Sequence, residues 1–216
     1  MNDIPLQSHT LRQALSLVRQ DLDRRLLLQG LRPSYFTYLG AVLHRGGMAV
    51  LLFRLLDYVD TRGWRIALKL GHLVQYHFGR AEIHSGARIG PGLVLPDIGG
   101  VGIPKFCEIG RNCTFVGPAL LTVGGMEGID LSTDRIIMGD NCVVGSNVRI
   151  MGAVTLGHGT QIKAGSVVIT SFPKEGYLLS GIPARRRAVL PLAAIRNWSP
   201  LRAQSLNETI VNSGKR

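Results

Sequence analysis

The stretch that decides the fold is residues 138–168, which read MGDNCVVGSNVRIMGAVTLGHGTQIKAGSVV. A bulky apolar residue returns there at every sixth position, and the same spacing occurs in two earlier segments. The positions are Met138, Val144, Ile150, Leu156, Ile162 and Val168, preceded by Ile103, Ile109, Phe115 and Leu121, and by Ile83, Ile89 and Leu95. A period of six matches neither the 3.6-residue turn of an α-helix nor the two-residue alternation of a strand. It predicts coils of short strands and turns, whose bulky side chains point inward and stack from coil to coil.

The residues around each bulky position support this interpretation. Glycine follows it directly at positions 90, 110, 139, 145 and 157, where we expect a turn that needs a positive φ or a close approach of two backbones. A small or β-branched residue stands four positions after it, and we expect that residue to point inward near a corner. The residues concerned are Ala87, Cys107, Cys113, Ala119, Cys142, Val148, Val154, Thr160 and Ser166. The sequence therefore predicts a mainly β protein, a hexapeptide-type solenoid with one continuous narrow core.

The three cysteines all fall in this small inward position. We interpret Cys107, Cys113 and Cys142 as buried, reduced packing thiols. A catalytic thiol or a metal site is the alternative, but no histidine lies at a ligand-like spacing from them, so we expect no metal. Because the chain also lacks a basic segment followed by an apolar leader, the cysteines predict a cytoplasmic protein.

The first 80 residues have helical periodicity. Leu11, Leu15, Val18 and Leu22 recur at spacings that place them on one face of a helix, and Gly30 ends the run. We expect a second helical stretch over about 36–58, interrupted at 46–47, and a third over about 64–78. We therefore divide the chain into an α-helical region at 1–80, a solenoid at 81–187 and a basic tail at 188–216.

Charge is concentrated at the two ends of the chain. The formal net charge is +11, of which residues 1–80 contribute +6 and residues 181–216 contribute +6, while residues 81–180 carry −1. Zinc-finger spacing and aromatic-interleaved basic stripes are absent from the sequence, so we expect no nucleic-acid partner. For the helical region, a bundle packed on the solenoid is one interpretation. The alternative is a basic amphipathic surface that touches an anionic membrane through residues Arg45, Arg54, Arg62, Arg65 and Lys69.

Six segments carry a resemblance to a known family. They are EIHSGARIG at 82–90, GLVLPDIGG at 92–100, IGRNCTF at 109–115, MGDNCVVGSN at 138–147, IKAGSVV at 162–168 and SGIPAR at 180–185. Over about Leu15–Arg187 the chain resembles the serine acetyltransferase-like branch of the hexapeptide-repeat acyltransferases, and it is similar also to exopolysaccharide and colanic-acid-type O-acetyltransferases. The resemblance implies a left-handed parallel β-helix, acetyl-CoA as donor, and a homotrimer with active sites between neighbouring subunits. The implied acceptor is a hydroxyl of a small amino acid or of a polysaccharide sugar.

The chain departs from the family where the resemblance places the catalytic histidine. The aligned segment is LPDIGG at 95–100, so Asp97 stands at the imidazole position and Glu82 at the position of the supporting carboxylate. The family's second histidine corresponds approximately to Arg135, which we expect to bind substrate. Two adjacent carboxylates share a proton, and this raises the pKa of one of them. A Glu82–Asp97 pair is therefore the predicted base, and a catalytically silent homologue that acts as a partner or regulatory subunit is the alternative.

The remaining site residues also follow from the resemblance. Acetyl-CoA is expected to contact Ser146, Gly152, Ala164 and Gly165, and its phosphates are expected to meet Lys163 and Arg185. The interrupting loop at 124–136 is expected to cover the acceptor site of the adjacent subunit. Two histidines are secondary candidates: His84 should point outward at a corner, and His158 should lie in a turn between two glycines, where a solvated role is the simpler interpretation of each.

Overall fold

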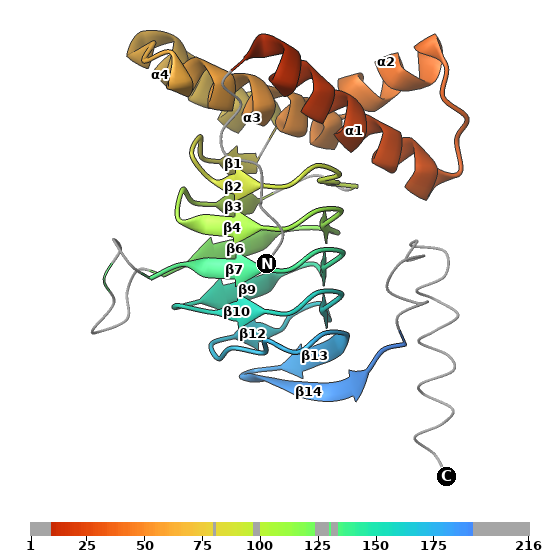
Figure 1. Ribbon diagram of the computed structural model, residues 1–216, viewed down its shortest axis with the longest axis vertical. Helices are drawn as coiled ribbons and strands as arrows, with labels where there is room; N and C mark the ends of the chain where they lie inside the picture. Colours follow the sequence, from red (N-terminus) through yellow and green to blue (C-terminus); the bar gives the residue numbers. More distant parts are fainter. Residues whose placement is uncertain (1–9, 80, 97–99, 124–129, 131–133, 192–216) are drawn as a thin grey trace.

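The computed structural model describes residues 10–79, 81–96, 100–123, 130 and 134–191. Four α-helices and a short π-helix lie across one end of a tall stack of short strands (Figure 1). The strands are β1 (Ala81–Ile83), β2 (Arg88–Ile89), β3 (Val101–Ile103), β4 (Cys107–Ile109), β5 (Thr114–Phe115), β6 (Ala119–Thr122), β7 (Ile136–Met138), β8 (Val143–Val144), β9 (Val148–Met151), β10 (Thr155–Leu156), β11 (Gln161–Ile162), β12 (Val167–Val168), β13 (Tyr177–Gly181) and β14 (Ala184–Val189).

The strands form the three faces of a prism. Sheet 1 has the order β1-β3-β6-β9-β12, sheet 2 the order β2-β4-β7-β10, and sheet 3 the order β5-β8-β11-β13-β14. Each pairing between successive coils is parallel, and only β13 and β14 pair antiparallel. The chain therefore passes from sheet 1 to sheet 2 to sheet 3 in every full coil, as the period of six predicts.

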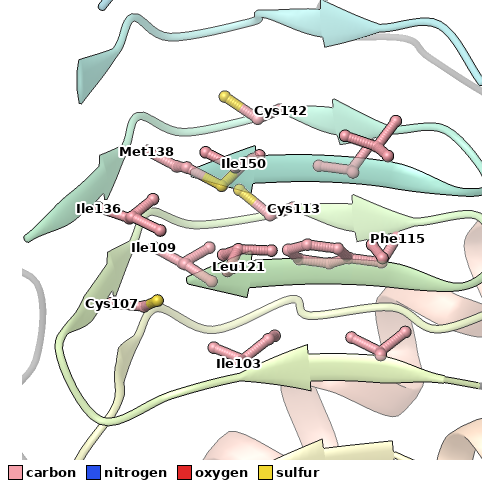
Figure 2. Close-up of a cluster of buried hydrophobic side chains, with 14 of the residues drawn as sticks. Ile103, Cys107, Ile109, Cys113, Phe115, Leu121, Ile136, Met138, Cys142 and Ile150 are labelled. Carbon is pink, nitrogen blue, oxygen red and sulfur yellow. The ribbon is translucent and has the colours of Figure 1, made fainter. Parts of the chain in front are cut away.

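The predicted core is confirmed. All thirteen bulky positions are at most 3% exposed, and so are the nine small positions. Figure 2 shows part of this interior, where Ile109, Leu121 and Phe115 lie next to the cysteine side chains. Cys107, Cys113 and Cys142 are free and buried, which confirms the packing interpretation. Burial raises the pKa of Cys107 to about 12. The hydrogen bond with Cys142, together with burial, raises the pKa of Cys113, so neither is a reactive thiolate near neutral pH.

Of the two reasons given for the repeated glycines, close backbone approach is the correct one. A Cβ on Gly139 would lie 2.6 Å from the His158 nitrogen, and one on Gly145 would lie 2.6 Å from the Ala164 nitrogen of the next coil. The positive φ angles lie elsewhere in the turns. Asn112, Asn141 and Asn147 take them at 57–58°, and several other glycines take them at 68° or more.

The helices are α1 (Leu11–Gln29), α2 (Tyr35–Leu43), α3 (Arg45–Thr61), α4 (Arg65–Val74) and the π-helix η1 (Gln75–Gly79). Thr10 caps α1, and Gly30 ends it in a left-handed conformation, as predicted. Two expectations need correction. Leu11 and Leu15 are about half exposed, because the buried face of α1 is built around Ala14, Val18 and Leu22 instead. The second stretch breaks at His44 rather than at 46–47, since both glycines lie inside α3.

The helices close the open end of the solenoid with buried charges. Arg54 of α3 pairs with Asp21 of α1 at 2.9 Å and donates to the carbonyl oxygens of Ile89 and Gly90. Asp21 also accepts hydrogen bonds from the backbone nitrogens of Gly92 and Leu93. The first coil has no preceding coil to pair with, so these side chains satisfy its backbone groups.

This arrangement changes the predicted basic surface. Arg54 is 2% exposed and cannot take part in it, whereas Arg45, Arg62, Arg65 and Lys69 are exposed. In the described part of the chain, each helix taken alone is too short or too polar to cross a membrane. Helices α2 and α3 meet the length and composition criteria only as a pair, and the chain bends by 85° between them.

Candidate active site

The candidate site lies at the corner where sheet 1 meets sheet 2. Glu82 is the outward residue of β1, and the strand register places it level with Gly102 and then Leu120. Two hollows meet at these three residues. One, of about 580 Å³, also contains Tyr76 and His77. Because Gly102 has no side chain, the surface stays open beside the Glu82 carboxylate.

The second hollow, of about 320 Å³, lies on the corner side of Glu82. Its walls include His84, Phe106 and Thr122, together with Leu120. His84 Nε2 lies 3.3 Å from Glu82 Oε1, and the backbone nitrogen of His84 donates to the Ile103 carbonyl at 3.0 Å. A carboxylate and an imidazole therefore share the rim of an otherwise mostly apolar hollow.

A second imidazole supports this pair from the helical side. The His72 ring of α4 lies 5.7 Å from the His84 ring, and His72 Nε2 lies 3.5 Å from Ser85 Oγ. Burial lowers the pKa of His72, and its electrostatic interaction with His84 lowers it further. His72 is therefore expected to stay neutral near pH 7, where it does not repel a proton on His84.

Asp97, the predicted partner of Glu82, lies outside the described residues. The structure therefore does not test the Glu82–Asp97 pair, and it shows that His84 is a partner of Glu82. The sequence contained a signal for this contact, since His84 directly follows β1 and the alternation of buried and exposed residues over 81–84 turns both Glu82 and His84 outward. The outward position of His84 at a corner was predicted, but its contact with Glu82 was not.

Arg135 lies at the same corner, directly before β7. Its Nη1 is 2.6 Å from Glu108 Oε1, and Arg88 Nη1 reaches the same oxygen at 3.3 Å. The side chain of Glu108 is 15% exposed, whereas both arginine side chains are about 40% exposed. Two guanidinium groups thus share one carboxylate, and the cluster keeps a net positive charge that can attract an anionic group.

The predicted donor-site residues divide between two corners. Ser146, Ala164 and Gly165 lie at the corner that leads from sheet 3 into sheet 1, where the Gly165 nitrogen donates to the Ser146 carbonyl at 2.8 Å. Lys163 lies in the same turn and is exposed, like Ala164 and Gly165.

Gly152 is on the other edge of sheet 1, at the corner of His84 and Arg135. Its nitrogen donates to the Thr122 carbonyl at 2.9 Å, which links it to the smaller hollow. Arg185 is exposed on β14 at the far end of the solenoid. A single chain thus brings four donor-site residues together and separates Gly152 and Arg185 from them.

Two further observations concern histidine and metal. The Asp140 nitrogen donates to Nδ1 of His158 at 2.9 Å, so this imidazole has a structural partner in the turn of the preceding coil. Among the described residues, His, Cys, Asp and Glu side chains do not gather in any group of three that could hold a metal ion.

Comparison with known proteins first defines the class. Residues 135–170 match the family model described as bacterial transferase hexapeptide (six repeats). The solved serine acetyltransferase of Neisseria gonorrhoeae superposes with a TM-score of 0.72 at 24% identity, covering 84% of this chain and 69% of that chain. The fold is therefore the left-handed parallel β-helix of hexapeptide-repeat transferases, preceded by helices.

Sequence relatives narrow the class. The serine acetyltransferase of Helicobacter pylori (strain J99) is 34% identical over 134 residues, which cover 61% of this chain and 75% of the relative. That of Bacillus licheniformis is 31% identical over 156 residues, covering 71% of this chain and 69% of the relative. The chain belongs to the serine acetyltransferase-like family of hexapeptide-repeat acyltransferases, which confirms the resemblance seen in its motifs.

Proposed function

We propose that this protein transfers the acetyl group of acetyl-CoA to the hydroxyl group of serine. The observation that carries the proposal is the Glu82–His84 pair on a solenoid whose relatives are serine acetyltransferases. The Arg135–Glu108 pair lies on the adjoining sheet, two coils further along. These relatives favour serine over a polysaccharide sugar as the acceptor. They also favour an enzyme over the alternative of a regulatory partner.

The charges at the corner fit an amino acid. Serine carries a carboxylate and an ammonium group on the carbon next to the one that bears its reacting hydroxyl. Arg135, which shares Glu108 with Arg88, has guanidinium hydrogens to offer a substrate carboxylate. The exposed Glu82 carboxylate suits the ammonium or the hydroxyl group of the same molecule. A neutral sugar has no group to pair with the arginines.

The donor is proposed to contact Ser146, Gly152, Ala164 and Gly165. Lys163 and, at the last coils, Arg185 supply positive charge for its phosphates. Because one chain places these residues on both edges of sheet 1, a complete donor site needs a second subunit beside the first. We therefore propose a homotrimer, in which a cleft between neighbours combines the two edges. Light scattering coupled to size-exclusion chromatography tests this, and a monomer that transfers acetyl groups at full rate contradicts it.

Three further expectations stay with the proposal. The Glu82–Asp97 carboxylate pair is the predicted base, and Glu82→Ala and Asp97→Ala test it. The free, buried cysteines suit a reducing cytoplasm. Contact of the exposed Arg62, Arg65 and Lys69 with an anionic membrane is tested by flotation with phosphatidylserine vesicles at low salt.

The function is tested by thiol release from acetyl-CoA with serine, and with monosaccharides as alternative acceptors. Arg135→Met is expected to raise KM for serine at least about tenfold, the equivalent of about 1.4 kcal/mol, with a smaller effect on KM for acetyl-CoA. Arg111→Met removes the same charge from an exposed position of the solenoid and is the matched control. Wild-type protein that binds acetyl-CoA and acetylates none of these acceptors overturns the proposal.

A further inference from the structure

We propose that His84, oriented by Glu82, is the general base that takes the proton from the acceptor hydroxyl. The inference rests on the proposed acetyl transfer and deepens it. Asp97 stands where the resemblance expects the catalytic imidazole, and an aspartate is ordinarily a much weaker base than a histidine. His84 supplies an imidazole from the turn that follows β1, at the rim of a hollow that the same carboxylate borders.

The backbone of His84 and the neighbouring Glu82 carboxylate both constrain the imidazole. Its backbone is held on β3 through the Ile103 carbonyl, and its Nε2 lies 3.3 Å from Glu82 Oε1. A carboxylate at Nε2 favours the tautomer in which this nitrogen carries the hydrogen, so Nδ1 has the free lone pair. Such a carboxylate also stabilises the imidazolium that forms when Nδ1 accepts a proton.

The hollow beside His84 has the size and the walls for a small acceptor. Its volume of about 320 Å³ exceeds the needs of a three-carbon amino acid. Phe106 and Leu120 provide apolar walls, and Thr122 also lines the hollow. Among the described residues, the titratable groups that face His84 are Glu82, two residues before it on β1, and His72 from α4.

The hollow is also connected to the predicted donor site. Gly152 hydrogen-bonds to Thr122, which lines the hollow, and both lie at the corner of His84. Along sheet 1 the corner residue after β1 is three strand spacings from the one after β9, or about 14 Å. An extended pantetheine arm that lies along this corner can span such a distance and bring its thioester to the hollow.

The proposed step conserves atoms and charge. The hydroxyl proton moves to His84 Nδ1 while the hydroxyl oxygen bonds to the thioester carbonyl carbon. The resulting tetrahedral oxyanion collapses and the C–S bond breaks. The proton then passes from the imidazolium to the departing sulfur, giving the O-acetyl ester and free CoA thiol.

The test compares His84→Gln with His158→Gln, which removes an exposed imidazole from the same solenoid. We expect His84→Gln to lower kcat by about 10²–10⁴-fold, as loss of a general base does. The expected change in Kd for acetyl-CoA, measured by calorimetry, is less than about twofold, and His158→Gln should retain wild-type kcat. The limb of the pH–rate profile that reports an essential base should disappear in His84→Gln. Added imidazole should partly restore the rate of His84→Ala, because the hollow is open to solvent.

Glu82→Gln separates an orienting role from a structural one. It should lower kcat while its circular dichroism spectrum and acetyl-CoA affinity stay unchanged. If His84→Gln keeps wild-type kcat while Asp97→Asn loses it, the inference is wrong and the carboxylate pair is the base, although the proposed function stands. If the wild-type protein transfers no acetyl group to any acceptor, the proposed function fails and this inference fails with it.

Discussion

Replacing Arg54 by methionine tests how the helices hold the first coil of the solenoid. The Arg54 guanidinium makes four hydrogen bonds, two to the Asp21 carboxylate and one each to the carbonyls of Ile89 and Gly90. Side chains of both ions are at most 2% exposed. Methionine has a similar length, so the substitution removes the charge and the donors without leaving a large cavity.

The magnitude follows from these contacts. Removing one partner of a buried ion pair costs about 3–5 kcal/mol, because the other charge stays buried without compensation. Asp21 keeps its hydrogen bonds from the backbone nitrogens of Gly92 and Leu93, so the lower half of this range applies to the carboxylate. The two orphaned carbonyls add about 1 kcal/mol or more. We therefore expect a loss of about 4 kcal/mol, which lowers Tm by about 8–16 °C in a chain of this size.

The direction in which the stability of the Arg54→Met variant changes with pH is a second check. Burial raises the pKa of Asp21, and the charge of Arg54 opposes that increase. In Arg54→Met the pKa of Asp21 must therefore rise further. A carboxyl with a raised pKa binds its proton more readily in the folded state than in the unfolded state, so its burial costs less as the pH falls. The double variant Arg54→Met/Asp21→Asn should therefore be more stable than Arg54→Met at pH 8, and the gap should narrow toward pH 5.

Urea unfolding followed by circular dichroism measures these differences, with Arg12→Met as a control that removes an exposed arginine from α1. The control should stay within about 0.5 kcal/mol of the wild type. Hydrogen exchange should also be faster at the amides of Gly92 and Leu93 in Arg54→Met. The reasoning is refuted if Arg54→Met unfolds within 1 kcal/mol of Arg12→Met, or if the gap to the double variant widens on acidification.

Two further predictions concern the interior and the coil spacing. In the folded protein Cys107, Cys113 and Cys142 should resist Ellman's reagent near pH 8, and all three should react once urea unfolds the chain. Fast labelling of the native protein would contradict their burial. Gly139→Ala should destabilise the protein by about 1–3 kcal/mol, because its Cβ would lie 2.6 Å from the His158 nitrogen. The control is Gly40→Ala on α2, whose Cβ meets nothing within 4 Å and which should stabilise the protein by about 0.5–1 kcal/mol. Equal stabilities of the two variants in urea unfolding would exclude the close-approach explanation.

The solenoid was predictable because it depends on the spacing of residues that are close together in the sequence. In a coil of six residues the chain itself decides which side chains point inward, so Ile109, Phe115 and Leu121 could be placed in one core from spacing alone. The glycines were harder, because a turn glycine serves either a positive φ or a close approach, and the sequence does not distinguish the two. Only the neighbouring coil shows that Gly145 meets the backbone of Ala164.

The contacts that the sequence could not give join residues far apart in the chain. Arg54 and Asp21 are 33 positions apart and lie on different helices. The sequence pattern therefore predicts a surface position for Arg54, although the structure buries it. Arg135 and Glu108 meet across two coils separated by the interrupting loop. For the site, motif alignment identified Glu82 and Arg135 as candidates. It could not show that an imidazole lies 3.3 Å from Glu82, on His84 in the turn that follows the strand.

The helices that cover the first coil also support the candidate site. Glu82 and His84 lie on the first coil, which has neighbouring coils on one side only. Ile89, Gly90 and Leu95 of the same coil bind arginines of α1 and α3 through their carbonyls, and Leu95 leads directly into the segment of Asp97. A coil with half its backbone partners missing would open more readily than the coils below it. The buried charges therefore hold the coil that carries Glu82 and His84 in place, and a variant such as Arg54→Met should lose acetyl transfer at temperatures where the rest of the solenoid remains folded.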